Sequence, residues 1–96
     1  MTSKQRAYLR GLANTLQPIF QIGKYGISEN LIKQLSDALE ARELLKITVL
    51  ETAPDTVKSL GEKIADSTNS ICVQTIGNKI TLYRARKKDS KIVLPE

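Results

Sequence analysis

Two glycines flank a lysine and a tyrosine at residues 23–26, which read Gly-Lys-Tyr-Gly. This motif follows the short apolar run 19–22 and precedes Ser28, a residue type that often begins a helix. Because glycine has no side chain, such a strand-to-helix turn lets backbone N–H groups approach a ligand closely, and the helix start adds partial positive charge. Lys24 adds a full positive charge. We therefore predict that the turn binds a phosphate group.

The residue types that the chain lacks exclude most kinds of active site. It has no histidine and one cysteine, Cys72. Catalytic triads that use histidine, zinc sites built on imidazole or several thiolates, and redox pairs of cysteines are therefore excluded. The ten acidic residues are scattered and mostly lie beside lysine or arginine. We predict a protein that is not an enzyme, with no catalytic residue, no metal site and no cofactor.

Length and hydropathy also bound the class of protein. Ninety-six residues make one domain, and no apolar run approaches the roughly 20 residues of a membrane helix. The first four residues lack the apolar stretch of a signal peptide, and a single cysteine suits a reducing compartment. We expect a cytoplasmic protein, and nothing in the sequence indicates more than a monomer.

The net charge of +5 is unevenly distributed along the chain. Residues 1–28 carry four basic and no acidic side chains, residues 29–78 carry five and eight, and residues 79–96 carry six and two, which gives +4, −3 and +4. This pattern is typical of a protein with a polyanionic partner, most commonly a nucleic acid. A solvated basic surface that aids solubility explains the charge equally well.

Hydrophobic periodicity predicts helices over 3–17, 28–41 and 55–67, and strands over 19–22, 44–50, 71–76 and 79–83. A two-residue Gly-Asn turn joins the last two strands as a hairpin. Half-polar strands favour a two-layer α+β domain with helices mainly on one face of the sheet. We expect this single domain to span residues 1–86, in the order helix-strand-helix-strand-helix-strand-strand, with a basic tail at 87–96.

Several local features follow from this pattern. We expect Ser3 and Ser28 to cap the first two helices. Gly61, inside the third helix, should cost about 1 kcal/mol relative to alanine. Alternation along the hairpin places Ile71, Val73, Ile80 and Leu82 on one side of the sheet and Cys72, Gln74, Thr81 and Tyr83 on the other.

Topology predicts where the basic residues meet. A helical crossover makes the first two strands parallel. If the third strand is parallel to them, the fourth is antiparallel, and the hairpin turn then lies at the same end of the sheet as residues 23–26. We expect the first helix to start at that end too, which would gather Lys4, Arg6, Lys24 and Lys79 there. Arg84 would leave the sheet at the opposite end, and the chain from Arg84 onward should be loosely held.

The first predicted helix contains a second hint of an anionic ligand. Arg6 and Arg10 are neighbours on the helix surface, and no acidic residue lies nearby in the sequence. Like charges at this spacing repel by roughly 0.2–0.5 kcal/mol, and an external anion would relieve them. Two solvated arginines are an equally good interpretation.

Three segments resemble a known family. The run 8–28, the segment 44–47 and the hairpin 74–84 are similar to the YhbY proteins, which are stand-alone chloroplast RNA splicing and ribosome maturation (CRM) domains, and the resemblance spans about residues 3–86. It implies a four-stranded mixed sheet in the order 1-2-4-3, like the C-terminal domain of bacterial translation initiation factor three. It also implies RNA binding, in association with the precursor of the large ribosomal subunit.

The glycine turn is similar to the G-x-x-G loop of KH domains, which clamps nucleotides by their backbone. The resemblance implies RNA contacts at this turn, with support from basic residues elsewhere. Tyr25 either stacks on a base or packs sideways, and with four aromatic residues in the chain we expect modest sequence specificity. The predicted RNA-binding residues are Arg6, Arg10, Gly23, Lys24, Tyr25, Gly26, Lys79, Arg84, Arg86, Lys87 and Lys88.

Two alternative functions stay open at this point. The first is a DNA-binding architectural protein, which requires duplex DNA to outcompete structured RNA. The second is a protein–protein adaptor that docks a partner on the polar sheet face. That face is predicted to consist of Lys46, Thr48, Gln74, Thr81 and Tyr83.

Overall fold

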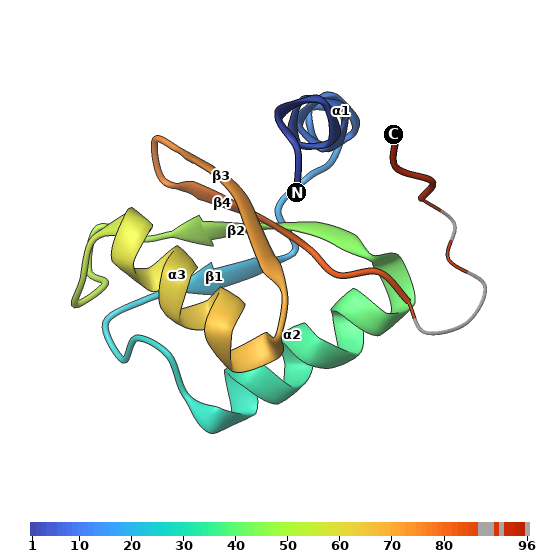
Figure 1. The fold of residues 1–96 in the computed structure, drawn as a ribbon. Coiled ribbons are helices and arrows are strands. Elements are labelled where there is room, and N and C mark those ends of the chain that lie inside the picture. The colour runs from blue at the N-terminus through green and yellow to red at the C-terminus, as the bar shows by residue number, and fades with distance from the viewer. Residues whose placement is uncertain (87–89, 91, 96) are drawn as a thin grey trace.

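The computed structural model describes residues 1–86, 90 and 92–95 and contains a mixed sheet with helices on both faces (Figure 1). Its elements in chain order are α1 (Ser3–Ala13), β1 (Phe20–Ile22), α2 (Glu29–Arg42), β2 (Leu44–Val49), α3 (Val57–Thr68), β3 (Ile71–Ile76) and β4 (Lys79–Tyr83). The predicted α+β class and element order are confirmed. The sheet order β1-β2-β4-β3, which the family resemblance implied, is confirmed as well.

Helix α1 begins at residue 3, as predicted, but its capping residue and its end differ from the prediction. Thr2, not Ser3, is the N-cap, because its side chain accepts a hydrogen bond from the backbone of Gln5 while the Gln5 side chain bonds back to Thr2. The helix ends at Ala13, four residues earlier than expected. The Thr15 hydroxyl donates to the carbonyl of Leu12 over 3.0 Å, and a proline at 18 disfavours helical backbone just before it.

The predicted strand directions are confirmed. β1 and β2 are parallel, and β4 is antiparallel to both β2 and β3. At the carboxyl ends of β1 and β2, Leu50 donates to the carbonyl of Ile22 (2.8 Å) and Val49 donates to the carbonyl of Asn78 (2.7 Å). The hairpin turn therefore lies at the same end of the sheet as the glycine turn, as predicted.

The main core lies between the sheet and the pair α2 and α3. Leu35 and Leu39 from α2 and Ile64 from α3 are fully buried there against Ile47 and Ile80 of the sheet. This burial explains the apolar stripes read from the sequence.

The position of Gly61 in α3 follows from how closely that helix approaches the sheet. A Cβ atom at Gly61 would lie 3.1 Å from the Cys72 sulfur and 3.3 Å from Cγ2 of Thr75. The lost helix propensity is therefore offset by close packing of α3 on β3.

A bulge in β3 makes the predicted facing of Ile71, Cys72 and Val73 wrong, whereas Gln74 lies on the same face as Thr81, as predicted. Cys72 pairs with Leu82 and Gln74 pairs with Thr81, so Val73 is an extra residue in β3. The extra residue shifts the alternation, and Ile71 and Val73 lie on the face opposite Ile80 and Leu82. Cys72 packs instead against the main core.

Helix α1 covers part of the second sheet face. Leu9 and Ala13 of α1 form a smaller core with Leu44, Val73 and Tyr83. The face that the sequence assigned to solvent is therefore partly closed, and Tyr83 is 4% exposed. Figure 1 shows α1 end-on while the strands run across the view, so this helix crosses the strands.

The crossing of α1 corrects the predicted cluster of Lys4, Arg6, Lys24 and Lys79. The Arg6 guanidinium donates to the carbonyls of Cys72 (3.0 Å) and Val73 (2.6 Å), near the start of β3. The glycine turn lies beyond the other end of that strand, so α1 does not start beside it.

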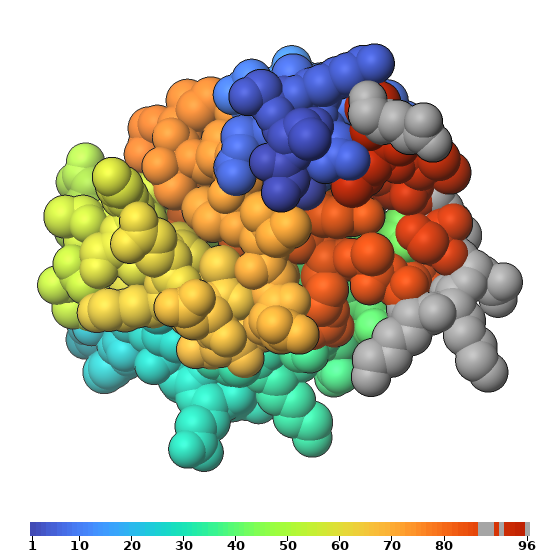
Figure 2. All heavy atoms as spheres, viewed as in Figure 1, coloured from blue at the N-terminus to red at the C-terminus, as the bar shows by residue number. Residues whose placement is uncertain are grey.

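The chain after β4 folds back onto the molecule, so the expectation of a loosely held segment from Arg84 onward is wrong for the described residues. The carboxylate of Glu43, which is 1% exposed, accepts hydrogen bonds from the backbone of Arg86 (3.1 Å) and Ile92 (2.8 Å). Ile92 and Leu94 pack against the smaller core. Figure 2 shows this C-terminal segment beside α1 on the surface.

Candidate nucleic-acid interface

The glycine motif forms a tight turn whose two central side chains project into solvent. The backbone of Gly26 donates to the carbonyl of Gly23 over 3.0 Å, which places Lys24 and Tyr25 at the central positions. Tyr25 is 86% exposed, so the alternative in which it packs sideways is wrong. The Lys24 ammonium lies 5.0 Å from the centre of the Tyr25 ring, within the range of a cation–π contact.

The fold restricts the residue type at one glycine of the turn but not at the other. Gly26 has a φ of 66°, which favours glycine, and a Cβ atom there would lie 3.0 Å from Cγ of Pro54. At Gly23 the nearest atoms to an added Cβ are 3.7 Å away on Leu50 and 3.8 Å away on Thr52, which is ordinary contact. The fold therefore requires glycine at position 26 and would accept alanine at position 23.

The turn leads directly into the start of α2. Ser28 caps this helix, as predicted, because its hydroxyl accepts from the backbone of Leu31 over 3.0 Å. Glu29 lies in the first turn of the helix and balances part of the positive end of the helix dipole. Lys24 thus supplies the full positive charge at this corner.

The acidic residue beside the turn is bound by its own helix. Asp55 lines a shallow hollow with Tyr25 and Gly26. Its carboxylate accepts from Lys63 (2.9 Å), from the Ser59 hydroxyl (2.8 Å) and from the backbone of Thr56 (2.8 Å). The hydrogen bond from Lys63, followed by those from Ser59 and Thr56, lowers the pKa of Asp55 to about 2.

Lys24 is therefore not held by a neighbouring carboxylate. Within the described part of the chain it makes no ion pair and no hydrogen bond, since both ion pairs found there involve other residues.

The two sides of the sheet differ in charge. No acidic residue lies on α1 or on any of the four strands, whereas α2 and α3 mix acidic and basic residues. The basic residues of α1 and the strands are Lys4, Arg6, Arg10, Lys46 and Lys79. The α1 side is thus the cationic side of the molecule, which favours a polyanion there.

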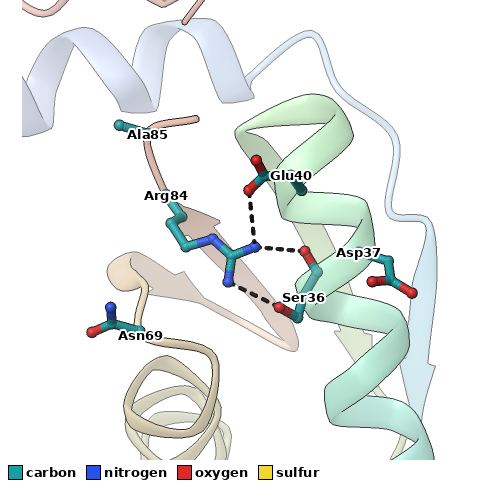
Figure 3. Close-up of a pocket in the computed structure, with 6 residues that line it drawn as sticks. All are labelled: Ser36, Asp37, Glu40, Asn69, Arg84 and Ala85. Atoms are coloured by element: carbon teal, nitrogen blue, oxygen red, sulfur yellow. Dashed lines mark hydrogen bonds and ion pairs between the residues drawn. The ribbon is translucent and has the colours of Figure 1, made fainter. Parts of the chain in front are cut away.

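Arg84, one of the predicted RNA-binding residues, is enclosed by acceptors at the opposite end of the sheet (Figure 3). Its guanidinium donates to the Ser36 hydroxyl (3.0 Å), the Ser36 carbonyl (2.7 Å) and the Thr68 carbonyl (2.7 Å), and lies 3.6 Å from Glu40. Asp37 lines the same hollow of about 430 Å³. The geometry gives Arg84 a structural role that links α2, the end of α3 and β4.

The other predicted contact residues are dispersed. Arg10 is exposed in the last turn of α1, and the backbone of Arg86 binds Glu43. The Lys79 ammonium donates to the side-chain oxygen of Asn78 over 2.9 Å. Lys87 and Lys88 lie outside the described residues. For all of these, RNA contact stays a prediction.

Sequence reasoning missed the loop that supports the turn. Residues 50–54 follow β2, and their side chains are the nearest neighbours of both glycines of the turn. A Pro-Asp pair at 54–55 was the available signal, but it indicated only the start of a helix.

The described residues show no other reactive centre. They contain no group of three or more histidine, cysteine or acidic side chains that could hold a metal ion. Burial raises the pKa of the Cys72 thiol, which disfavours the reactive thiolate. Burial also raises the pKa of Tyr83, and the charge of Glu43 adds to this effect. In the same part of the chain, no helix has the length and apolarity that crossing a membrane requires.

Comparison with known proteins gives consistent matches. The family model of the CRS1 / YhbY (CRM) domain matches residues 1–84. The chain is 45% identical over 95 residues to "Probable RNA-binding protein YqeI" of Bacillus subtilis, covering 99% of each chain. It is 34% identical over 95 residues to an "RNA-binding protein" of Haemophilus influenzae, covering 99% of this chain and 95% of that protein. The solution structure of a hypothetical protein from Staphylococcus aureus matches with a TM-score of 0.83 and 50% identity over 99% of each chain.

Proposed function

Because the chain belongs to the CRS1 / YhbY (CRM) domain family, we propose that it binds RNA by holding the sugar–phosphate backbone against the Gly23–Gly26 turn. The family resemblance noted in the sequence is thereby confirmed. The names of the Bacillus and Haemophilus relatives, which match along almost their whole length, support RNA as the ligand.

The observation that carries the proposal is the open backbone at Gly23. The fold leaves room for a side chain at this position, so packing within the protein does not explain the glycine. A ligand that approaches the backbone closely would explain it, because a Cβ atom would then stand between the N–H groups and the ligand. A phosphate on this corner would receive backbone N–H groups and the ammonium of Lys24 together.

Charge and exposure favour the same ligand. Lys24 has no acidic partner in the described chain, so its charge is available to a phosphate. Tyr25 presents an exposed ring beside it, on which an unpaired base can stack. Affinity that comes mainly from phosphate contacts should fall steeply as salt increases.

We further propose that the protein is not an enzyme. The predicted absence of catalytic chemistry agrees with the names of the relatives, which describe binding. The RNA that we propose is ribosomal RNA of the large-subunit precursor, bound in the cytoplasm by a monomer. The support for this RNA is the resemblance to the YhbY proteins.

The adaptor alternative loses part of its surface. Of the five polar-face residues, Thr81 is 1% exposed and Tyr83 is 4% exposed. The DNA alternative has no observation that favours it over RNA, and competition with duplex DNA decides it.

The test is a binding titration of Lys24→Glu with a labelled fragment of ribosomal RNA. Loss of one phosphate contact and reversal of the charge should weaken binding about tenfold and reduce the salt slope by about 0.7. The matched control is Lys33→Glu, which makes the same charge change at an exposed lysine of α2 and should bind within about twofold of the parent protein. Unchanged affinity of Lys24→Glu, or displacement of the RNA by duplex DNA at equal concentration, would overturn the proposal.

A further inference from the structure

Helix α1 covers only part of the sheet face against which it packs. On the uncovered part, the side chains form rows across the strands. The row nearest the glycine turn contains Gln21, Thr48, Lys79 and Ile76, and the next row contains Lys46, Thr81 and Gln74. The third row contains Leu44 and Tyr83, which lie beneath α1. In Figure 1 the β3–β4 hairpin extends beyond α1 at the end where the first row lies.

These two rows and the end of α1 form a groove of about 170 Å³. Its lining residues are Asn14, Lys46, Gln74, Ile76, Lys79 and Thr81. They supply two ammonium groups, two side-chain amides and one exposed apolar side chain, Ile76, which is 64% exposed. The groove is smaller than the 300–1,000 Å³ typical of pockets for drug-sized ligands, so it has room for part of one nucleotide, such as a phosphate group or a base edge.

The two lysines of the groove have no negative partner in the described chain. Neither takes part in the two ion pairs found there, and the surrounding strands and α1 contain no acidic residue. Lys46 is half-buried on the central strand β2. It is a diagonal neighbour of Lys79 across β2 and β4, and the backbones of such neighbours lie about 7–8 Å apart. The Lys79 ammonium donates to the side-chain oxygen of Asn78, which leaves its charge uncompensated, so an anion on this face would be attracted by both lysines.

The groove also lies close to the glycine turn. Gln21, Thr48 and Lys79 are direct neighbours across β1, β2 and β4, and the turn begins two residues after Gln21. Two strand spacings correspond to about 10 Å, a distance that a few linked nucleotides span. One RNA strand can therefore occupy both places.

We propose that this groove is a second RNA contact, which binds a nucleotide close along the strand to the one held at the Gly23–Gly26 turn. Its phosphate lies between Lys46 and Lys79. Its base contacts Ile76 and forms hydrogen bonds with the amides of Gln74 and Asn14, because amides both donate to and accept from base edges. This inference rests on the proposed function and assigns a specificity-determining surface that the turn alone lacks.

The test compares the double variant Lys46→Gln/Lys79→Gln with the parent protein on a uridine dinucleotide, which is too short to reach both places, and on an oligouridylate of about twelve nucleotides. The longer RNA reaches both places, so its affinity should fall about tenfold and its salt slope by about 0.7, for the one phosphate held between the two lysines. The shorter RNA should bind the parent and the double variant equally. The matched control is Lys33→Gln/Lys58→Gln, which removes two exposed lysines from α2 and α3 and should leave both affinities unchanged.

Two outcomes would overturn the inference while leaving the proposed function intact. In the first, the double variant binds the longer RNA as well as the parent does, while Lys24→Glu weakens it. In the second, the double variant loses the same factor on both lengths, which would indicate general attraction rather than a site. If Lys24→Glu also has no effect on either RNA, the proposed function itself fails. Thermal melting of each variant checks that the variant is folded under the conditions of the binding assay.

Discussion

At one end of the sheet Lys24 projects into solvent with only a tyrosine ring beside it, whereas at the other end Arg84 is enclosed by two carbonyls, a hydroxyl and a carboxylate. The sequence assigned both cations to RNA binding. The structure separates them by what their charges already contact. A cation whose donors are used within the fold contributes to stability, and one that lacks partners is available to a ligand.

The largest effect is expected for Arg84→Ala. The change removes the guanidinium that donates to the carbonyls of Ser36 and Thr68 and to the Ser36 hydroxyl, so the free energy of unfolding should fall by about 2–4 kcal/mol. RNA affinity, measured at a temperature where the variant is folded, should stay within about twofold of the parent. Urea titration followed by circular dichroism measures the stability.

Arg84→Lys serves as the graded control for that prediction. It keeps the charge but loses the planar fork that reaches two acceptors, so its stability should lie between those of the parent and the alanine variant. A stable Arg84→Ala protein with about tenfold weaker RNA binding would restore the arginine to the RNA interface and contradict the comparison.

Substitutions of the two glycines of the turn should differ in their effect on stability. Gly26→Ala forces a side chain into the left-handed region and against Pro54, which should cost about 1–2 kcal/mol of stability. Gly23→Ala meets only ordinary contacts, so its stability should change by less than about 0.5 kcal/mol.

RNA affinity tests whether Gly23 has a role in binding in addition to its place in the fold. Gly23→Ala should bind RNA several-fold more weakly than the parent, although it is folded normally. Thermal melting and a binding titration on the same samples measure both properties. Normal RNA affinity in Gly23→Ala would mean that no ligand approaches this backbone closely.

The smallest expected effect concerns Asp55, the acid beside the turn. Its folded pKa of about 2 lies below the ordinary 3.8, so its contribution to stability is complete above the ordinary value and is lost as the pH falls towards 2. Asp55→Asn should be slightly less stable than the parent at neutral pH, and the difference should disappear near pH 2. The measurement is urea unfolding across this pH range.

Asp37→Asn is the matched control for the stability measurement at neutral pH, because Asp37 is exposed on α2 and makes no hydrogen bond within the described part of the chain. Its stability should stay within about 0.5 kcal/mol of the parent. Asp55→Asn should leave the RNA affinity unchanged, because Asp55 does not bind Lys24. If the Lys24 ammonium were bound to Asp55, the substitution would release it and RNA binding would become stronger.

Features with a local cause were predictable from the sequence. The Gly-Asn hairpin, the Ser28 cap and the strand β3 from Ile71 to Ile76 depend on residues that are adjacent in the chain. The glycine turn was recognised for the same reason. From these features the sequence also predicted the end of the sheet at which the proposed RNA contact lies.

Features that depend on distant contacts were not predictable. The bulge at Val73 turns Cys72 to the opposite face of the sheet. The carbonyls of Cys72 and Val73 accept hydrogen bonds from the guanidinium of Arg6. Glu43 holds the chain after β4 through backbone groups more than 40 residues away in sequence. Whether an arginine is free or bonded depends on which acceptors the fold leaves unpaired, and a single sequence does not contain that information.

If the exposed cation at the Gly23–Gly26 turn binds RNA and the enclosed Arg84 does not, an NMR titration of the backbone amides with a short single-stranded RNA will distinguish the two ends of the sheet. We expect the amides of Gly23, Lys24, Tyr25 and Gly26 to shift with RNA concentration while those of Ser36, Asn69 and Arg84 stay fixed. Shifts at Ser36, Asn69 and Arg84 with an unaffected glycine turn would contradict this expectation.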